Sequence, residues 1–348
     1  MKKAIIVGAT GFGGLGLIEI LLRHPGFEIK QLIARKDVGK GVHQVFPHLK
    51  GHCEMTVEDN ESIDYSQADI AFFSTPDRAG MTLIRSFYEK GIPVIDFSGD
   101  FRFRTTDEYS VYARNKSMED HHLTPDMLAE AVYGLPEIYA DKIKKARIVG
   151  NPGCFAISMI LGLLPAAEAG ILDGQTVICD GKTGVSGAGK NPGEANFYPQ
   201  RYEDVNTYRE GKHQHIVEVE NILTQRSGRP LKVFFVPQIV PLNRGILTTI
   251  YADAVPGMNL KKLKEIYESY YRDKPFIVLT DNSPHTTDVR GSNRCEIRVM
   301  MDERTGKILI TSAIDNLLKG QSGNAVQNAN LMMGFDEKTA LDVTPFYP

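Results

Sequence analysis

The sequence has few cysteines and no concentration of charge. Its 348 residues include four cysteines, at positions 53, 154, 179 and 295, which are too far apart for a CxxC pair or a metal-ligand spacing. No basic run exceeds two or three residues and the formal net charge is -3. Composition therefore gives no reason to expect nucleic acid or an anionic membrane as a partner. We expect no disulfide scaffold and no metal site.

The sequence also lacks a long hydrophobic run. Its longest apolar segment, residues 154–167, contains Ser158 and Pro165 and is too short to cross a bilayer. The N-terminal apolar run 4–8 is too short for a signal peptide and has no small-residue cleavage pattern. We therefore expect a cytoplasmic protein without a membrane segment.

The N-terminus reads as a strand, a glycine turn and a helix. An apolar run at 4–7 precedes glycines at 8, 11 and 14, and apolar residues then recur at helical spacing. Such a turn lets the backbone approach a pyrophosphate at the helix N-terminus, although a plain strand-to-helix connection is the alternative. The predicted cofactor contacts here are Gly8, Thr10, Gly11, Phe12 and Gly13.

The second expected strand, 28–34, is followed by Arg35 and Lys36. An acidic residue at this place accepts hydrogen bonds from the ribose of NAD, whereas basic side chains pair with the 2′-phosphate of NADP. We therefore prefer NADP(H) as cofactor; a solvated basic pair is the competing interpretation.

Alternating strands and helices continue to residue 150. Strands at 70–73, 93–98 and 146–149 and a helix at 78–90 predict a Rossmann-type doubly wound parallel sheet. Ligands of such sheets bind beyond the carboxyl ends of the strands, which adds four residues to the predicted cofactor site: Ser74, Thr75, Pro76 and Ser98. Residues 105–122 are expected to be irregular and 132–137 to form a turn.

The second half is richer in strands. A helix is expected at 260–271, and the expected strands are 176–180, 233–240, 245–255, 276–280, 295–301 and 307–313. This pattern predicts an α+β domain with a mixed or antiparallel sheet. A last helix through Val326, Ala329 and Met333 is expected to return to the first domain. We place the nucleotide-binding domain at 1–150 plus 315–348, and the catalytic and oligomerisation domain at 151–314.

Cys154 is the best candidate nucleophile. Apolar residues at helical spacing follow it, so it should lie in the first turn of a helix. The unpaired N–H groups and the dipole of a helix N-terminus favour a thiolate. Pro152 and Gly153 can turn the chain and leave the sulfur accessible. An inert buried cysteine is the alternative.

Two later segments could assist this cysteine. The glycine-rich stretch 181–190 could supply backbone N–H donors, or it is only a surface loop. His213 and His215 flank a helix start; two apart on a helix, they would face different directions. They suit a general base better than a metal site, and a structural role is the alternative. Arg102 is a candidate anion binder.

The ordered motifs resemble the N-acetyl-gamma-glutamyl-phosphate reductases of the aspartate-semialdehyde dehydrogenase-like superfamily. The resemblance covers nearly the whole chain. The motifs that carry it are Gly8-Ala9-Thr10-Gly11-Phe12, Asp100-Phe101-Arg102, Tyr133-Gly134-Leu135-Pro136-Glu137, Gly150-Asn151-Pro152-Gly153-Cys154, Gly184-Val185-Ser186-Gly187-Ala188-Gly189, Arg244-Gly245-Ile246, Asp315-Asn316-Leu317 and Gly323-Asn324-Ala325-Val326-Gln327-Asn328.

The resemblance implies an NADPH-dependent reduction of an acyl phosphate through a cysteine thioester. It implies Cys154 as nucleophile, with His213 as the first and His215 as the second choice of acid/base. The remaining implied contacts are Asn151 for the oxyanion, Arg102, Arg244 and Ser186 for the substrate, and Ser186, Gly187 and Asn316 for the cofactor. It also implies a homodimer or homotetramer.

Two other functions compete. One is aspartate-semialdehyde dehydrogenase, or a reductase of a glutamyl or aminoadipyl phosphate blocked by a group other than acetyl. The other is a catalytically silent nucleotide-binding sensor. The presence of Cys154 together with His213 and His215 argues against the sensor.

Overall fold

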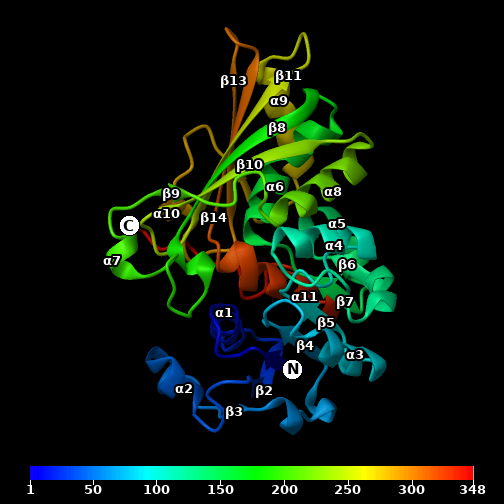
Figure 1. Cartoon of the computed structure of the whole chain (residues 1–348), viewed down its shortest axis with the longest axis vertical. Coiled ribbons are helices and arrows are strands. Elements are labelled where there is room, and N and C mark those ends of the chain that lie inside the picture. The colour runs from blue at the N-terminus through cyan, green and yellow to red at the C-terminus, as the bar shows by residue number, and fades with distance from the viewer. Residues whose placement is uncertain (348) are drawn as a thin grey trace. The chain divides into compact units, whose positions relative to one another are not determined.

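The computed structural model describes residues 1–347 and contains two compact units. Unit 1 comprises residues 1–110, 120–152 and 321–342, and unit 2 comprises residues 111–119, 153–320 and 343–347. Each unit is built on a seven-stranded sheet (Figure 1). The predicted fold class, a doubly wound parallel sheet plus a second mixed sheet, is confirmed.

The sheet of unit 1 is parallel throughout, with the order β3-β2-β1-β4-β5-β7-β6. Its strands are β1 (Lys2–Val7), β2 (Phe27–Ile33), β3 (Val57–Glu58), β4 (Ile70–Phe73), β5 (Val94–Asp96), β6 (Ala131–Tyr133) and β7 (Ile148–Gly150). Val7 of β1 pairs with Phe73 of β4, so the turns after these two strands are neighbours. The strand order reverses here, which is where doubly wound sheets bind their ligands.

The helices of unit 1 connect and cover these strands. They are α1 (Phe12–Leu21), α2 (Val42–Val45), α3 (Met81–Glu89), α5 (Pro136–Ile143) and α11 (Gly323–Met333). The C-terminal helix α11 packs against α1 and α5. The chain thus returns to unit 1 at its last helix.

Two predictions in this half are wrong. Residues 105–122, expected to be irregular, contain α4 (Thr106–Asn115). The hydroxyl of Thr105 accepts the Glu108 N–H at 3.3 Å, and the Glu108 carboxylate accepts the Arg104 N–H at 2.9 Å, so a T-x-x-E cap starts this helix. Residues 132–137, expected to form a turn, contain the end of β6 and the start of α5, where Pro136 suits the first helical position.

The sheet of unit 2 is mixed, in the order β12-β13-β14-β11-β8-β10-β9. Its strands are β8 (Leu172–Thr183), β9 (Asn206–Thr207), β10 (Lys232–Ile239), β11 (Ile246–Ala254), β12 (Ile277–Leu279), β13 (Cys295–Asp302) and β14 (Lys307–Ile314). Strand β8 is parallel to β10, and β12 to β13; the other pairs are antiparallel. Such a mixed sheet agrees with the predicted α+β domain.

Helices cover one face of this sheet. The central helix α6 (Cys154–Glu168) contacts β11 and β14, while α8 (His215–Ser227) contacts β10 and α9 (Leu260–Tyr271) contacts β13 (Figure 1). Residues 155–167 of α6 are all buried, which explains its almost wholly apolar sequence. Two short helices complete the unit: α7 (Tyr198–Arg201) and α10 (Thr286–Val289).

The glycine-rich stretch 181–190 is more ordered than a surface loop. Strand β8 continues to Thr183, and a 3₁₀ turn covers Val185–Ala188. A β-carbon on Gly181 would lie 2.6 Å from the Phe155 ring and 2.8 Å from the Phe235 ring. Glycine is needed there because two aromatic rings approach the backbone.

Candidate functional site

The glycine turn of unit 1 lies against the end of β4. Gly8 has φ +90°, and a β-carbon on it would lie 2.3 Å from the Ser74 carbonyl oxygen. A β-carbon on Gly13 would lie 2.3 Å from the Ser74 hydroxyl. Gly11 caps α1 without any side-chain acceptor. The first turn of α1 therefore has no side-chain cap, and the glycines at 8 and 13 form a cradle packed against Ser74, which suits a pyrophosphate site.

The predicted cofactor residues at the strand ends have different surroundings. The Thr75 hydroxyl oxygen is buried and has no hydrogen-bond partner, as expected of a group that meets a ligand. In contrast, the Ser98 hydroxyl donates to Asp96 Oδ2 at 2.5 Å and accepts the Asp100 N–H at 3.1 Å. Pro76 is exposed.

Arg35 and Lys36 are exposed just beyond β2. The N–H groups of Gly8 and Ala9 both donate to the Ile33 carbonyl, at 2.8 and 3.1 Å. The glycine turn therefore touches the end of β2, two residues before Arg35. Asp37, which follows the pair, forms a salt bridge with Lys40 at 2.8 Å.

Asn151 is held by unit 1. Its Oδ1 accepts from Asn324 Nδ2 at 2.7 Å and Asn328 Nδ2 at 3.2 Å, and its Nδ2 donates to the Gln321 carbonyl at 3.1 Å. These two asparagines of α11 also donate to the Gly134 carbonyl. These bonds tie α11 to the ends of β6 and β7, and they occupy the Asn151 amide.

Arg102 makes a similar internal contact. Its Nε donates to the Asn151 carbonyl at 2.8 Å, and its Nη2 donates to the Phe97 carbonyl at 2.6 Å. Its positive charge also favours the carboxylate forms of Asp96 and Asp100. Burial acts in the opposite direction and prevails, so the pKa of both aspartates is raised.

Cys154 is the first residue of α6, as predicted. It is half-buried, whereas Cys53, Cys179 and Cys295 are buried. The N–H of the preceding Gly153 donates to the buried Glu218 carboxylate of α8 at 2.9 Å. On the other side, a β-carbon on Gly320 would lie 2.8 Å from Cys154 Cβ. These close contacts fix the start of α6.

The two histidines are in contact with one another, because only His215 is in α8. His213 lies before the helix, so the expectation that both point away from each other along one helix is wrong. Their ring centroids are 4.7 Å apart, and His213 Nδ1 accepts the His215 N–H at 3.2 Å. A β-carbon on Gly153 would lie 2.1 Å from His215 Nε2. The structure thus places His215 next to the residue that precedes Cys154.

His213 lies deeper in unit 2. Its ring meets those of Phe155 and Phe235, at centroid distances of 5.8 and 5.3 Å. Burial, with the nearby charges of Arg209 and Lys116, lowers the pKa of His213 to about 3. His213 is therefore neutral at physiological pH.

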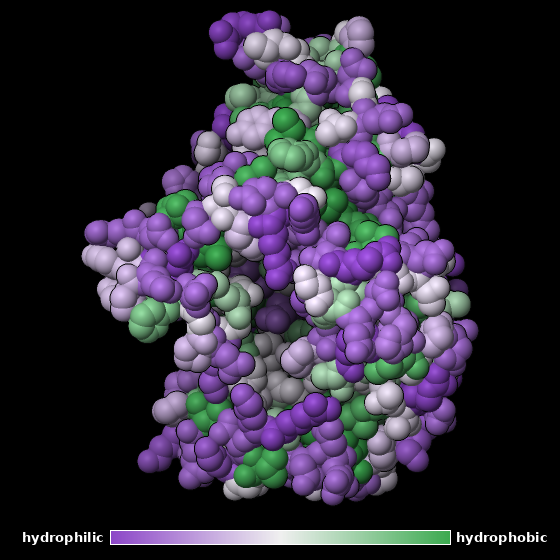
Figure 2. Space-filling model, in the orientation of Figure 1, coloured by the Kyte–Doolittle hydropathy of each residue, from purple (hydrophilic) through white to green (hydrophobic). Residues whose placement is uncertain are grey.

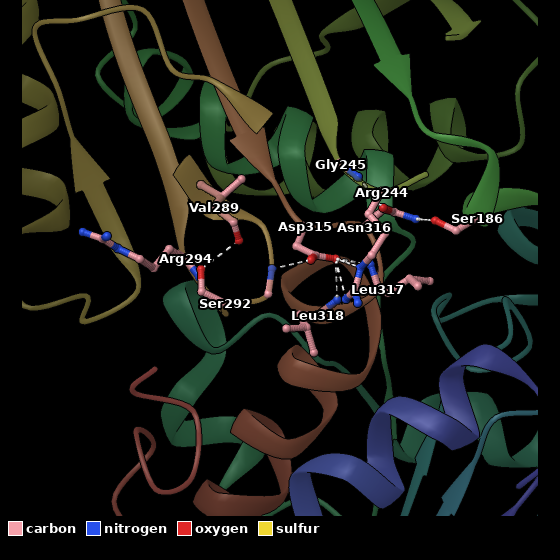
Figure 3. A network of polar contacts seen from close by, with 11 residues as sticks. Ser186, Arg244, Gly245, Val289, Ser292, Arg294, Asp315, Asn316, Leu317 and Leu318 are labelled. Carbon is pink, nitrogen blue, oxygen red and sulfur yellow. Dashed lines mark hydrogen bonds and ion pairs between the residues drawn. The ribbon is translucent and has the colours of Figure 1, made fainter. Parts of the chain in front are cut away.

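Arg244 belongs to a polar network that centres on Asp315 (Figure 3). The fully buried Asp315 carboxylate accepts from Arg244 Nη2 at 3.0 Å and from the N–H groups of Gly291 and Leu317 at 2.7 and 2.9 Å. About a quarter (27%) of the Arg244 side chain stays exposed. Arg244 is therefore oriented by a buried carboxylate and still reaches solvent.

Asn316 connects Ser186 to the same network. Its Oδ1 accepts the Gly245 N–H at 2.7 Å, and its Nδ2 donates to the Ser186 hydroxyl at 3.0 Å. Gly187 lies in the same 3₁₀ turn as Ser186. These three predicted cofactor contacts belong to unit 2, whereas the glycine turn and the strand-end residues belong to unit 1.

Sequence reasoning assigned no role to several residues that position the site. Glu218, Asp315, Asn324 and Asn328 are all buried polar residues with partners distant in sequence. The spacing of Asn324 and Asn328 does place both amides on one helix face, which was a usable signal. Nothing local marks Glu218, and Asp315 stands in one of the motifs that carry the resemblance but received no role of its own.

The described part of the chain gives no sign of a metal or membrane site. Residues 1–347 hold no group of three or more His, Cys, Asp or Glu side chains arranged to bind a metal ion. They also contain no helix of sufficient length and apolarity to cross a membrane.

Two family models match the chain. Residues 3–146 match the semialdehyde dehydrogenase NAD binding domain, and residues 154–316 match the semialdehyde dehydrogenase dimerisation domain. Together they span most of both units.

Curated relatives match over the full length. The chain is 40% identical over 352 residues to an N-acetyl-gamma-glutamyl-phosphate reductase of Geobacter sp. strain M21, and 41% identical over 354 residues to one of Thermoanaerobacter pseudethanolicus. Each alignment covers 100% of both chains.

Solved structures share the fold at lower identity. Aspartate semialdehyde dehydrogenase II of Vibrio cholerae has a TM-score of 0.73 and 20% identity, over 96% of this chain and 99% of that chain. The Candida albicans aspartate semialdehyde dehydrogenase, solved with NADP, has a TM-score of 0.66 and 17% identity, over 96% and 98%. At these identities the likeness is one of fold.

Proposed function

The chain belongs to the N-acetyl-gamma-glutamyl-phosphate reductase family, and we propose that it reduces N-acetyl-gamma-glutamyl phosphate to N-acetylglutamate semialdehyde and phosphate. NADPH is the reductant, and the reaction serves arginine biosynthesis. Full-length relatives at about 40% identity favour this substrate over aspartate semialdehyde, for which the likeness is structural only.

The placement of His215 beside Cys154 carries this proposal. Cys154 begins α6, where N–H groups without intrahelical partners favour a thiolate, and His215 Nε2 lies against the neighbouring Gly153. A nucleophile with an adjacent acid/base is the arrangement that covalent acyl transfer needs. We therefore assign the acid/base role to His215, the reverse of the order that the resemblance implied.

His213 acts through His215. It accepts the His215 N–H and stays neutral, because burial and two nearby cations oppose its protonation. A neutral imidazole in this position fixes the start of α8 and thereby the direction of His215.

The chemistry then follows in two stages. The Cys154 thiolate attacks the acyl carbon, the C–S bond forms, and the C–O bond to phosphate breaks to leave a thioester. Hydride supplied by NADPH reduces this thioester to a thiohemiacetal oxyanion. His215 takes the proton of the Cys154 thiol when the thiolate forms, and as an imidazolium it donates a hydrogen bond to the oxyanion. Collapse of the oxyanion then breaks the C–S bond, which releases the aldehyde and restores the thiolate. Backbone N–H groups in the first turn of α6 stabilise the oxyanion.

Unit 1 supplies the cofactor site. The cradle at Gly8 and Gly13 excludes side chains, and the buried Thr75 hydroxyl lacks a partner, so both fit a bound dinucleotide. Arg35 and Lys36 fit the 2′-phosphate, which distinguishes NADP from NAD. We propose the following cofactor residues: Gly8, Thr10, Gly11, Phe12, Gly13, Arg35, Lys36, Ser74, Thr75, Pro76, Ser98, Ser186, Gly187 and Asn316.

The proposed substrate residues differ in whether their polar groups are already bonded within the protein. Arg244 is oriented by Asp315 and partly exposed, so its guanidinium suits a substrate carboxylate. Ser186 lies in the same network. The observed donors of Arg102 bond to backbone carbonyls, and the Asn151 amide is bonded to α11. Their contacts favour positioning roles for Arg102 and Asn151.

Unit 2 also offers a surface for self-association. Phe234, Ile178 and Tyr251 lie in register on β10, β8 and β11 and are about half exposed (51%, 47% and 45%). They point away from the helix-covered face, and Figure 2 shows hydrophobic residues gathered over the strands of this unit. This unit contains the matched dimerisation domain. We propose that a second copy covers this row, in a homodimer or homotetramer.

We propose a cytoplasmic location, which the wide spacing of the four cysteines along the chain supports.

The proposed function is tested by the reverse reaction. The purified protein should oxidise N-acetylglutamate semialdehyde with NADP⁺ only when inorganic phosphate is present. Faster turnover of aspartate semialdehyde, or turnover independent of phosphate, would reject the proposal.

A further inference from the structure

The loop that follows β14 turns around the buried side chain of Asp315. The N–H groups of Leu317 and Leu318 donate to Asp315 Oδ1, at 2.9 and 3.3 Å, as in the turns that aspartate forms with the backbone that follows it. The Asp315 carbonyl accepts the Gly320 N–H at 2.9 Å. Asp315 therefore shapes the chain from residue 315 to residue 320 with both its side chain and its backbone.

The far end of this loop contacts the candidate nucleophile, within unit 2. A β-carbon on Gly320 would lie 2.8 Å from Cys154 Cβ and 3.4 Å from Cys154 Cα. Gly320 belongs to a π-helical turn, Leu318–Ser322, a rare conformation that is frequent at functional sites. Because the Gly320 backbone packs directly against the start of α6, the path of the loop limits where Cys154 can lie.

The same carboxylate holds Arg244 (Figure 3). Arg244 Nη2 and Nε donate to Asp315 Oδ1 at 3.0 and 3.3 Å, and the Gly291 N–H donates to Asp315 Oδ2 at 2.7 Å. Asp315 is fully buried, so water does not compete for these bonds. Removal of the carboxylate would leave these donors without their acceptor, which costs more than the loss of a surface ion pair.

We propose that Asp315 is a positioning residue for two groups at once: its loop sets the place of Cys154, and its carboxylate directs Arg244. This inference rests on the proposed function, in which Cys154 attacks the acyl carbon and Arg244 binds the substrate carboxylate. The acyl carbon and the carboxylate belong to one molecule, so attack requires a fixed separation between the nucleophile and the guanidinium. Asp315 maintains this separation from outside the substrate pocket, because its oxygens are bonded within the protein.

Two variants that lose the same charge separate these effects in the reverse reaction. Asp315→Ala removes every side-chain bond, whereas Asp315→Ser keeps a hydroxyl that accepts the Leu317 N–H. Both should raise KM for N-acetylglutamate semialdehyde at least about fivefold, because Arg244 loses the acceptor that orients it. Only Asp315→Ala should also lower kcat, at least about tenfold, because the loop that backs Cys154 loses its turn.

The pH dependence of Cys154 alkylation gives a second readout, which needs no turnover. The apparent thiol pKa should be higher by at least about 0.5 in Asp315→Ala than in Asp315→Ser, because a displaced helix start stabilises the thiolate less. General destabilisation would not produce this difference between two variants of equal charge. Asp253→Ala, which removes an exposed ion pair with Lys307 in the same unit, should change none of these values.

Equal kcat in the two Asp315 variants, equal thiol pKa, or a wild-type KM in both would each overturn the inference. If Asp315→Ala does not fold, Gly320→Ala replaces it, because the added methyl group pushes on Cys154 while Asp315 stays intact. This variant should lose kcat at least about tenfold with KM within about twofold, and a normal kcat would overturn the inference.

Failure of the proposed function gives a different result. Absence of phosphate-dependent turnover in the wild-type protein would reject that function whatever the variants do. The comparison of the Cys154 thiol pKa between Asp315→Ala and Asp315→Ser then decides whether Asp315 positions the nucleophile, because alkylation requires neither substrate nor cofactor.

Discussion

The His215 imidazole occupies the space that a side chain on Gly153 would need. A β-carbon on Gly153 would lie 2.1 Å from His215 Nε2, a distance that no real contact allows. Position 153 therefore requires glycine because any side chain there would collide with the His215 ring, whatever backbone conformation the turn needs. This contact connects the start of the Cys154 helix to the first residue of α8.

Gly153→Ala should consequently displace His215 while Cys154 stays in place. We expect kcat to fall at least about 100-fold, the usual contribution of a positioned acid/base, with the pH–rate profile changed as well. Gly193→Ala is the matched control, because a β-carbon there meets open space. Normal kcat in Gly153→Ala would show that His215 does not act at this site.

The basic pair after β2 predicts cofactor preference. In Arg35→Ala/Lys36→Ala, KM for NADPH should rise about 10-fold or more while KM for NADH stays within about twofold, because only NADPH has the 2′-phosphate. Lys40→Ala is the control, since Lys40 pairs with Asp37. Steady-state kinetics with both nucleotides measure the effect. An equal loss for the two would contradict the assignment.

The buried aspartates of unit 1 predict a dependence of stability on pH. Burial raises the pKa of Asp100 above the ordinary value of 3.8, and the charge of Asp96 adds to this. The folded protein therefore holds more protons than the unfolded chain, so this group lowers stability as pH rises from about 4 toward neutrality. The groups that face Asp100 through bonds or charge are Asp96, Arg78, Ser98 and Arg102.

Asp100→Asn should remove the loss of folding stability that the buried Asp100 carboxyl causes as pH rises. Relative to wild type, the variant should gain at least about 1 kcal/mol of unfolding free energy between pH 5 and pH 8. Denaturant unfolding at both pH values measures the gain, with the exposed Asp173→Asn as control. A gain of the opposite sign, or the same difference at both pH values, would show that Asp100 is ionised like an ordinary surface carboxylate.

The strong periodic patterns in the sequence predict most of the fold. The helix expected at 260–271 coincides with α9, because Leu263, Tyr267 and Tyr271 are buried at helical spacing and Asn259 caps its start. The predicted strands of the second half agree with the structure within a few residues. The helix α4 is missed because its apolar pattern is weak and its start depends on a cap at Thr105.

The candidate site is less accessible to sequence reasoning. Cys154 is predicted at a helix start because the residues that determine this follow it directly. The contact between the His213 and His215 rings depends on where α8 begins, which the sequence does not fix. The hydrogen bond from Arg102 to the Asn151 carbonyl joins residues 49 positions apart and depends on the tertiary fold. Glu218 accepts the Gly153 N–H across 65 residues of sequence, so no local motif predicts this contact.

The exposed apolar row of Phe234, Ile178 and Tyr251 in unit 2 predicts where two copies of the chain contact each other. Phe234→Glu should place a charge in the covered surface and shift the protein to a smaller species in light scattering after gel filtration. Leu22→Glu, an exposed apolar residue of unit 1, should leave the assembly unchanged. A Phe234→Glu protein with wild-type mass would exclude this row as the contact.

The covalent role of Cys154 is tested most directly by a single turnover without phosphate. Excess N-acetylglutamate semialdehyde and NADP⁺ should give a burst of one NADPH per active site and then stop, because the thioester has no acceptor. Mass spectrometry should find the acyl group on the Cys154 peptide, and added phosphate should release it and restart turnover. No burst, or an acyl group on any other residue, would contradict the mechanism.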